Sequence, residues 1–105
     1  MPFIDTGQLP AIEKRPGWRG RTFHSPSMTF AHWEFVAGAT IHAHAHEQEE
    51  VWHVLEGELE VTIDGATAVA GPGMVAIVPP GTSHGMRALS DGKAIVVDHP
   101  RRSEF

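Results

Sequence analysis

Four side chains able to bind a metal ion stand in two short stretches of the chain: His44, His46 and Glu50 in the first, His84 in the second. One residue separates His44 from His46, so both imidazoles leave the same face of an extended strand. Glu50 follows beyond a short turn at 47–49, and even parity returns it to that face. We expect His84 to arrive from a distant strand. The pattern predicts three imidazoles and a carboxylate around one ion.

This set of donors favours some metals over others. Neutral imidazoles with a carboxylate oxygen suit iron, manganese, nickel, copper or zinc better than calcium or magnesium. The alternative is a closed zinc site that only stabilises the fold. Structural zinc favours thiolate ligands, and the chain contains no cysteine. We therefore expect one divalent transition metal ion as a cofactor, with its identity open.

The elements that must position these residues are short strands. The chain has 11 Gly and 8 Pro, which divide it into apolar-rich pieces too short for ordinary helices. Spacings near ten residues predict an all-β sandwich or barrel. The expected strands are Trp18–His24, Met28–Val36, Thr40–His46, Glu50–Leu55, Glu58–Ile63, Thr67–Ala70, Val75–Val78, His84–Ala88 and Ala94–His99.

Turn residues fix how these strands connect. Asp64-Gly65 lies between two alternating segments, and such a pair accepts the positive φ of a two-residue hairpin turn. Gly71-Pro72-Gly73 and Pro79-Pro80-Gly81 predict corners where the chain leaves one sheet and enters the next.

Length and composition predict a single domain. The chain has 105 residues, 41% apolar, which suits one core. We divide it into an N-terminal arm at 1–17 that lies along the barrel or a neighbouring subunit, a barrel at 18–99 and a tail at 100–105. The net charge of −5 argues against a nucleic-acid partner. No leader pattern and no long apolar run occurs, so we expect a cytoplasmic protein without a membrane partner.

The two metal-binding stretches resemble the two motifs of the cupin family. From Gly38 to Gly57 the order is Gly, five residues, His, one, His, three, Glu, six, Gly; from Gly73 to His84 it is Gly, five residues, Pro, one, Gly, two, His. In the family the second motif continues with three residues and Asn. Only this last position departs, because Ala88 stands there. The resemblance to a small RmlC-like cupin implies a jelly-roll barrel, or double-stranded β-helix, with metal positions open to water or substrate. It also implies a homodimer.

His42 shares the parity of His44 and His46, so His42, His44 and Gln48 form an alternative ligand run. We prefer His44 and His46, because only they stand at the family distance from both motif glycines. His42 then lies on the same inner face nearer the rim. There it is a candidate catalytic residue, as a proton carrier or substrate contact, or else a solvated histidine at the mouth.

A narrower resemblance is to the one-domain cupins that open unsaturated uronate sugars. The run Val54-Leu55-Glu56-Gly57 matches, as do Pro100 and Arg102 of a tail that reads Asp-x-Phe-x-Pro-x-Arg in that family. Val96 and Asp98 replace its Asp and Phe, and Glu50 stands where Gln is common. The resemblance implies a substrate-binding Arg102. Asp98 keeps the inward parity and is a candidate catalytic acid or base.

Two further side chains are candidate substrate-binding residues. Trp52 shares the face of Glu50 and would wall the cavity. Arg21, on the first expected strand, would bind a substrate carboxylate through its guanidinium fork, although arginines on such strands also serve to protect a sheet edge.

These residues indicate a metal-dependent enzyme that acts on a small oxygenated or carboxylated, sugar-like molecule inside the barrel. An isomerase or ring-opening enzyme would use the metal as a Lewis acid with a carboxylate moving protons. A cupin dioxygenase would need a redox metal. The alternatives are a non-catalytic cupin that binds or senses a metal or small ligand, and a structural assembly partner.

Overall fold

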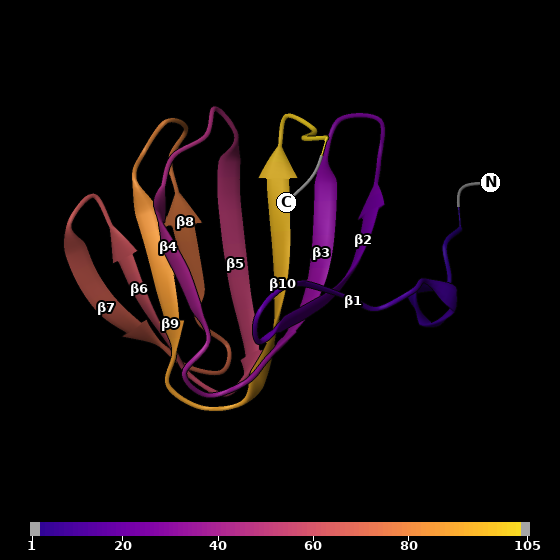
Figure 1. Cartoon of the computed structure of the whole chain (residues 1–105). Helices are drawn as coiled ribbons and strands as arrows, with labels where there is room; N and C mark the ends of the chain where they lie inside the picture. Colours follow the sequence, from indigo (N-terminus) through magenta and orange to yellow (C-terminus); the bar gives the residue numbers. More distant parts are fainter. Residues whose placement is uncertain (1–2, 104–105) are drawn as a thin grey trace.

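The computed structural model describes residues 3–103, which form two antiparallel β-sheets packed face to face (Figure 1). The six-stranded sheet has the order β1-β2-β3-β10-β5-β8, and the four-stranded sheet has the order β4-β9-β6-β7. The predicted all-β jelly roll is therefore confirmed. The elements are a 3-10 helix η1 (Thr6–Gln8) and strands β1 (Ile12–Arg15), β2 (Trp18–His24), β3 (Thr29–Phe35), β4 (Thr40–His44), β5 (Glu49–Glu56), β6 (Leu59–Ile63), β7 (Ala66–Ala70), β8 (Val75–Val78), β9 (His84–Ala88) and β10 (Gly92–His99).

The core lies between the sheets because alternate residues of each long strand point inward. In β3 the buried residues are Thr29, Ala31, Trp33 and Phe35, which gives the period of two expected for one covered face. The Trp18 indole lies at the centre, 6.4 Å from the ring of Trp33 and 5.9 Å from that of Trp52, each in an edge-to-face arrangement. Three indoles thus form one wall of the interior.

Both predicted kinds of turn are present. The β6–β7 hairpin turns at Asp64 and Gly65, which have φ of 50° and 79°. The corner at 71–73 carries the chain from β7 of the smaller sheet to β8 of the larger one, and the corner at 79–81 carries it back to β9. The second corner is the one that delivers His84 to the site.

No strand was expected before Trp18, but Ile12–Arg15, within the segment expected to be an arm, form one. This segment is β1, which pairs with β2 and forms an edge of the larger sheet. Pro16 and Gly17 make the connecting turn, with Gly17 at φ 85°, and a Pro-Gly pair after a short strand is a turn signal that the sequence did offer. The preceding η1 lies to the side of the barrel (Figure 1). In the described part of the chain, no helix is long and apolar enough to cross a membrane.

Candidate metal centre

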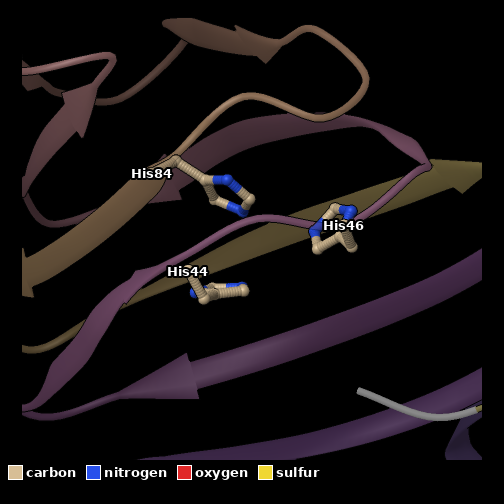
Figure 2. Close-up of side chains that lie close together, drawn as sticks. All are labelled: His44, His46 and His84. Atoms are coloured by element: carbon tan, nitrogen blue, oxygen red, sulfur yellow. The ribbon is translucent and has the colours of Figure 1, made fainter.

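Three imidazoles converge at one end of the barrel interior (Figure 2). His44 ends β4 and lies directly opposite His84, the first residue of β9, with ring centroids 4.4 Å apart. His46 follows β4, and its ring lies 4.8 Å from that of His84. One ligand atom from each ring lies within 4.8 Å of the other two. The late histidine thus meets the earlier pair as the motif spacing predicts.

Backbone carbonyls orient all three rings. The Nδ1 atoms of His44, His46 and His84 lie 2.9, 3.1 and 2.9 Å from the carbonyl oxygens of His42, Gln48 and Thr82. A carbonyl oxygen only accepts, so in its neutral form each imidazole carries its proton on Nδ1 and keeps a lone pair on Nε2. This is the tautomer that a metal-binding imidazole needs.

The corner before β9 also fixes His46. The backbone N–H of Gly81 donates to the carbonyl oxygen of His46 at 2.8 Å. The two motifs are therefore linked by their main chains as well as by their imidazoles. This link holds the segment after β4 in place although it lies outside the strand.

Glu50 lies beside two of the rings and is buried, with 3% of its surface exposed. Its Oε2 is 3.2 Å from His46 Nε2, and its Oε1 is 3.4 Å from His84 Nε2. Neither contact has hydrogen-bond geometry, so within residues 3–103 these two buried ring nitrogens have no hydrogen-bond partner. Two buried ring nitrogens next to a carboxylate, without a hydrogen bond to it, fit a cation between them.

Glu50 also belongs to a second group of polar side chains, which consists of Trp52, Arg102 and Asp98. The Trp52 Nε1–H donates to Glu50 Oε1 at 2.5 Å. Arg102 Nη1 donates to Glu50 Oε2 at 3.1 Å and to Asp98 Oδ2 at 3.2 Å. One ligand atom from each of His46, Glu50 and Asp98 lies within 4.8 Å of the other two. Glu50 is thus shared between the imidazoles and a buried Asp–Arg pair.

The two carboxyl groups of this second group, those of Glu50 and Asp98, have very different pKa values. Burial acts to raise the pKa of Glu50, but contacts with His84, Asp98 and Trp52 outweigh it and lower this pKa to about 2. Burial, and then the neighbouring Glu50, raise the pKa of Asp98 to about 8 against the opposing effect of Arg102. Near neutral pH the pair therefore holds one proton, on Asp98.

The pKa values of the three imidazoles also shift in different directions. Desolvation by burial is the largest effect on His44 and His46 and lowers the pKa of each. Burial acts in the same direction on His84, but Glu50 and the Thr82 carbonyl outweigh it and raise the pKa of His84.

A cavity opens in front of this cluster. Its empty volume, including the mouth, is about 430 Å³. Trp18, Trp33, Ile41, Trp52 and Met86 supply apolar walls, and His44, Glu50, His84, Arg15 and Arg102 supply polar groups. Aromatic and apolar walls that carry convergent polar groups are typical of a small-molecule site. Trp52 and Arg102 thus line the cavity, and their contact with a substrate stays a prediction.

Two predicted site residues lie elsewhere. The placement of His42 on the inner face is wrong, because a β-bulge between Ile41 and His44 breaks the alternation and leaves His42 exposed. Its carbonyl, not its ring, orients His44. Arg21 does not line the cavity: its Nε donates to the Leu9 carbonyl at 3.1 Å and holds the N-terminal segment. Its proposed role in binding a carboxylate has no support from this geometry.

Asp98 points inward, as parity predicts, but it is fully buried and does not line the cavity. It contacts Glu50 and Arg102 from behind, so it can hold a proton for them without touching a ligand. Its predicted catalytic role stays a prediction.

Two residues of this site were not foreseen from the sequence. Arg15 reaches the cavity from β1, a strand that was not expected. Thr29 Oγ1 accepts from the Arg102 backbone N–H at 2.9 Å and donates to the Arg102 carbonyl at 3.0 Å, so it anchors the tail that carries this arginine. No local pattern marks Thr29, since 73 residues separate the two partners.

Residues 31–100 match the family model described as a cupin domain. The chain belongs to the cupin family. An RmlC-like cupin from Shewanella frigidimarina NCIMB 400 is similar in structure, with 27% identity, a TM-score of 0.91 and coverage of 98% of this chain and 94% of that one. KdgF from Halomonas sp. has 27% identity, a TM-score of 0.90 and coverage of 98% and 96%.

A third solved structure, that of TT1209 from Thermus thermophilus, has 31% identity and a TM-score of 0.77 over 97% of this chain and all of that one. No curated protein sequence matches this cupin. Each of these three solved structures aligns with 97% or more of this chain.

Proposed function

We propose that this cupin is a metal-dependent enzyme that acts on a small oxygenated or carboxylated, sugar-like molecule in the cavity. The single observation that carries the proposal is the set of three imidazoles whose Nδ1 atoms all face carbonyls, so that their Nε2 atoms are free for a cation next to Glu50. His44, His46, His84 and Glu50 would hold one divalent transition metal ion. When bound, the ion supplies a Lewis acid that polarises an oxygen of the molecule.

The chain's own residues provide the rest of the site. Trp52 and Arg102 fix the two oxygens of Glu50, and Asp98 keeps a proton next to them near neutral pH. The indole walls exclude water from the inner part of the cavity. A buried acid beside a carboxylate is the arrangement that a proton-moving isomerase needs.

Among reactions of this kind, we favour the isomerisation or opening of a sugar acid. The motif spacing and the Pro100 and Arg102 tail resemble the uronate-linearising cupins, and the full-length similarity to Halomonas KdgF supports the same choice. The second candidate is a dioxygenase, which the same imidazoles and carboxylate suit if the ion is redox active. A non-catalytic metal or ligand sensor is the third.

One set of assays separates these candidates. The purified protein is loaded with each of zinc, nickel, manganese and iron(II), then tested for loss of the absorbance of an unsaturated uronate and for oxygen uptake. Chromophore loss without oxygen uptake supports the ring-opening enzyme, and metal-dependent oxygen uptake supports the dioxygenase. His44→Ala is the control and should abolish either activity. Binding without turnover under every metal would contradict an enzymatic role.

We also propose a cytoplasmic homodimer. The apolar side chains of Leu55, Val75 and Ile77 are 42%, 51% and 59% exposed on β5 and β8, at one edge of the larger sheet, and a second copy would cover them. Light scattering after gel filtration should give twice the chain mass, and the mass of a single chain would contradict the dimer.

A further inference from the structure

One cationic side chain of the cavity has no role in the metal centre described above. Arg15 lines the cavity together with His44 and the indoles of Trp18 and Trp33. It is only partly exposed. Among the residues that the structure describes, no hydrogen bond or ion pair holds its guanidinium. A partly buried cation on an apolar wall without a counter-charge is costly unless a ligand supplies one.

An irregularity in the β1–β2 pairing brings Arg15 to this position. Glu13 pairs with Arg19, but the next pair joins Arg15 to Trp18, so Lys14 is an extra residue in β1. Paired residues share a face, and Trp18 points into the core. Without the extra residue, Lys14 would face the cavity and Arg15 would face solvent. The bulge therefore selects an arginine, whose planar fork suits a carboxylate, over a lysine.

The other arginine of the cavity is already engaged. Arg102 donates to the carboxyl groups of both Glu50 and Asp98, at 3.1 and 3.2 Å. Its charge is therefore offset within the protein. Arg15 is left as the group able to attract an anion into the cavity next to His44.

We propose that Arg15 is a substrate-binding residue that pairs with the carboxylate of a small organic acid, whose ring or carbon chain lies on the indole wall. Two parallel hydrogen bonds from the guanidinium fix the acid, and its other oxygens then face the imidazoles. The inference rests on the proposed function in so far as both use the same cavity. It deepens that function by assigning the residue that recognises the carboxylate of the acid.

The test uses matched pairs of probes, an acid and its neutral counterpart: D-galacturonate with D-galactose, and benzoate with benzamide. Binding of each is measured by calorimetry on metal-loaded and metal-free protein. At least one acid should bind wild type more tightly than its neutral partner, in both forms. Arg15→Gln should weaken binding of that acid by about 10- to 100-fold, the worth of a charge-assisted hydrogen bond, and leave the neutral probe unchanged.

Two further variants isolate the cause. Arg15→Lys keeps the charge but loses the fork, so it should fall between wild type and Arg15→Gln. Arg19→Gln removes the same charge from the outer face of neighbouring β2 and should bind the acid like wild type. Thermal unfolding and metal content of all three variants show whether the fold and the metal centre are intact.

Three results would overturn the inference. They are acids that bind no better than their neutral partners, equal losses in Arg15→Gln and Arg19→Gln, or a preference for acids that requires the metal and is unchanged in Arg15→Gln. The last would place the carboxylate on the ion. Failure of every activity assay would reject the proposed enzyme and leave this binding preference measurable, so the two ideas fail separately.

Discussion

Asp98 lies directly opposite Glu50 in the pairing of β10 with β5, and Arg102 Nη1 bridges the two carboxyl groups at 3.2 and 3.1 Å. Two carboxyls this close share one proton, and the pKa of about 8 for Asp98 against about 2 for Glu50 places it on Asp98. The carboxylate that faces the imidazoles is therefore the charged one. The buried acid behind it is neutral near pH 7.

This pair should make the stability of the metal-free protein depend on pH. The pKa of Asp98 rises from its ordinary 3.8 to about 8, so between these values the folded chain holds a proton that the unfolded chain has lost. The contribution of Asp98 to the unfolding free energy is therefore complete below about pH 4 and is lost as the pH rises through about 8. The lowered pKa of Glu50 acts in the opposite sense, and its contribution is lost as the pH falls from 4.5 towards about 2.

Urea unfolding of metal-free Asp98→Asn tests the first of these statements. The amide does not titrate, so its unfolding free energy should fall less than that of wild type between about pH 5 and about pH 9. Asp64→Asn, which removes an exposed carboxylate in the β6–β7 turn, should follow the wild-type curve. Parallel curves for wild type and Asp98→Asn would contradict the raised pKa of Asp98.

The hydrogen bond from Trp52 to Glu50 should matter to metal affinity. Trp52→Phe keeps an aromatic ring in the cavity wall but removes the N–H that holds Glu50 Oε1. Loss of a group that orients a metal ligand lowers affinity by about 10- to 100-fold. Competition with a zinc chelator measures the change. Trp18→Phe is the matched control, because the Trp18 N–H donates to the Thr40 carbonyl and not to Glu50; an equal loss in both variants would point to general damage of the core.

The bulge in β4 predicts opposite outcomes for two neighbouring histidines. His44→Ala removes a ring from the cluster and should reduce bound zinc to well below one ion per chain, as measured by elemental analysis. His42→Ala removes an exposed ring and keeps the carbonyl that orients His44, so its zinc content should equal that of wild type. Loss of zinc in His42→Ala with retention in His44→Ala would mean that this register of β4 is wrong.

The same two residues show how far the sequence could lead. Period-two alternation and Pro-Gly punctuation placed most strands within a residue or two, and the spacing of His44, His46, Glu50 and His84 predicted the convergence that the structure has. Parity arguments fail at a bulge, because one extra residue transfers all later side chains to the other face. That is why His42 was placed inside. Arg15 was missed because its strand, β1, was not expected, and the bulge in β1 would have misled a parity argument there as well.

Long-range contacts set the other limit. The tail carrying Arg102 is held by the hydroxyl of Thr29, and no periodicity within β3 distinguishes this buried threonine from an apolar core residue. The hydrogen bonds that fix Arg102 depend on two segments meeting at the end of the folded sheet. They become visible only when the pairing of β3 with β10 is known.

Thr29 should therefore contribute to both stability and site geometry. Thr29→Val has nearly the same shape but leaves the Arg102 backbone N–H and carbonyl without their partner, which should lower the unfolding free energy by about 1–3 kcal/mol. Thr29→Ser keeps the hydroxyl and should restore most of that loss. Urea unfolding gives the free energies. A valine variant as stable as the serine variant would show that the tail does not depend on this contact.

The raised pKa of His84 predicts that metal binding displaces a proton. Burial lowers the pKa of His44 and His46, whereas for His84 the effect of Glu50 outweighs that of burial and raises the pKa, so in the metal-free protein His84 keeps its proton to a higher pH than the other two rings. A ligand imidazole must lose its proton, so zinc affinity should rise with pH as His84 titrates, and zinc binding at a pH where His84 is protonated should release that proton. Calorimetry in two buffers of different ionisation enthalpy measures the number of protons released directly.

Glu50→Gln removes the charge that holds the proton on His84, so it should bind zinc more weakly and release fewer protons per bound ion at the same pH. A binding enthalpy that is independent of the buffer in wild type, or a proton count that is unchanged in Glu50→Gln, would contradict the coupling of His84 to Glu50.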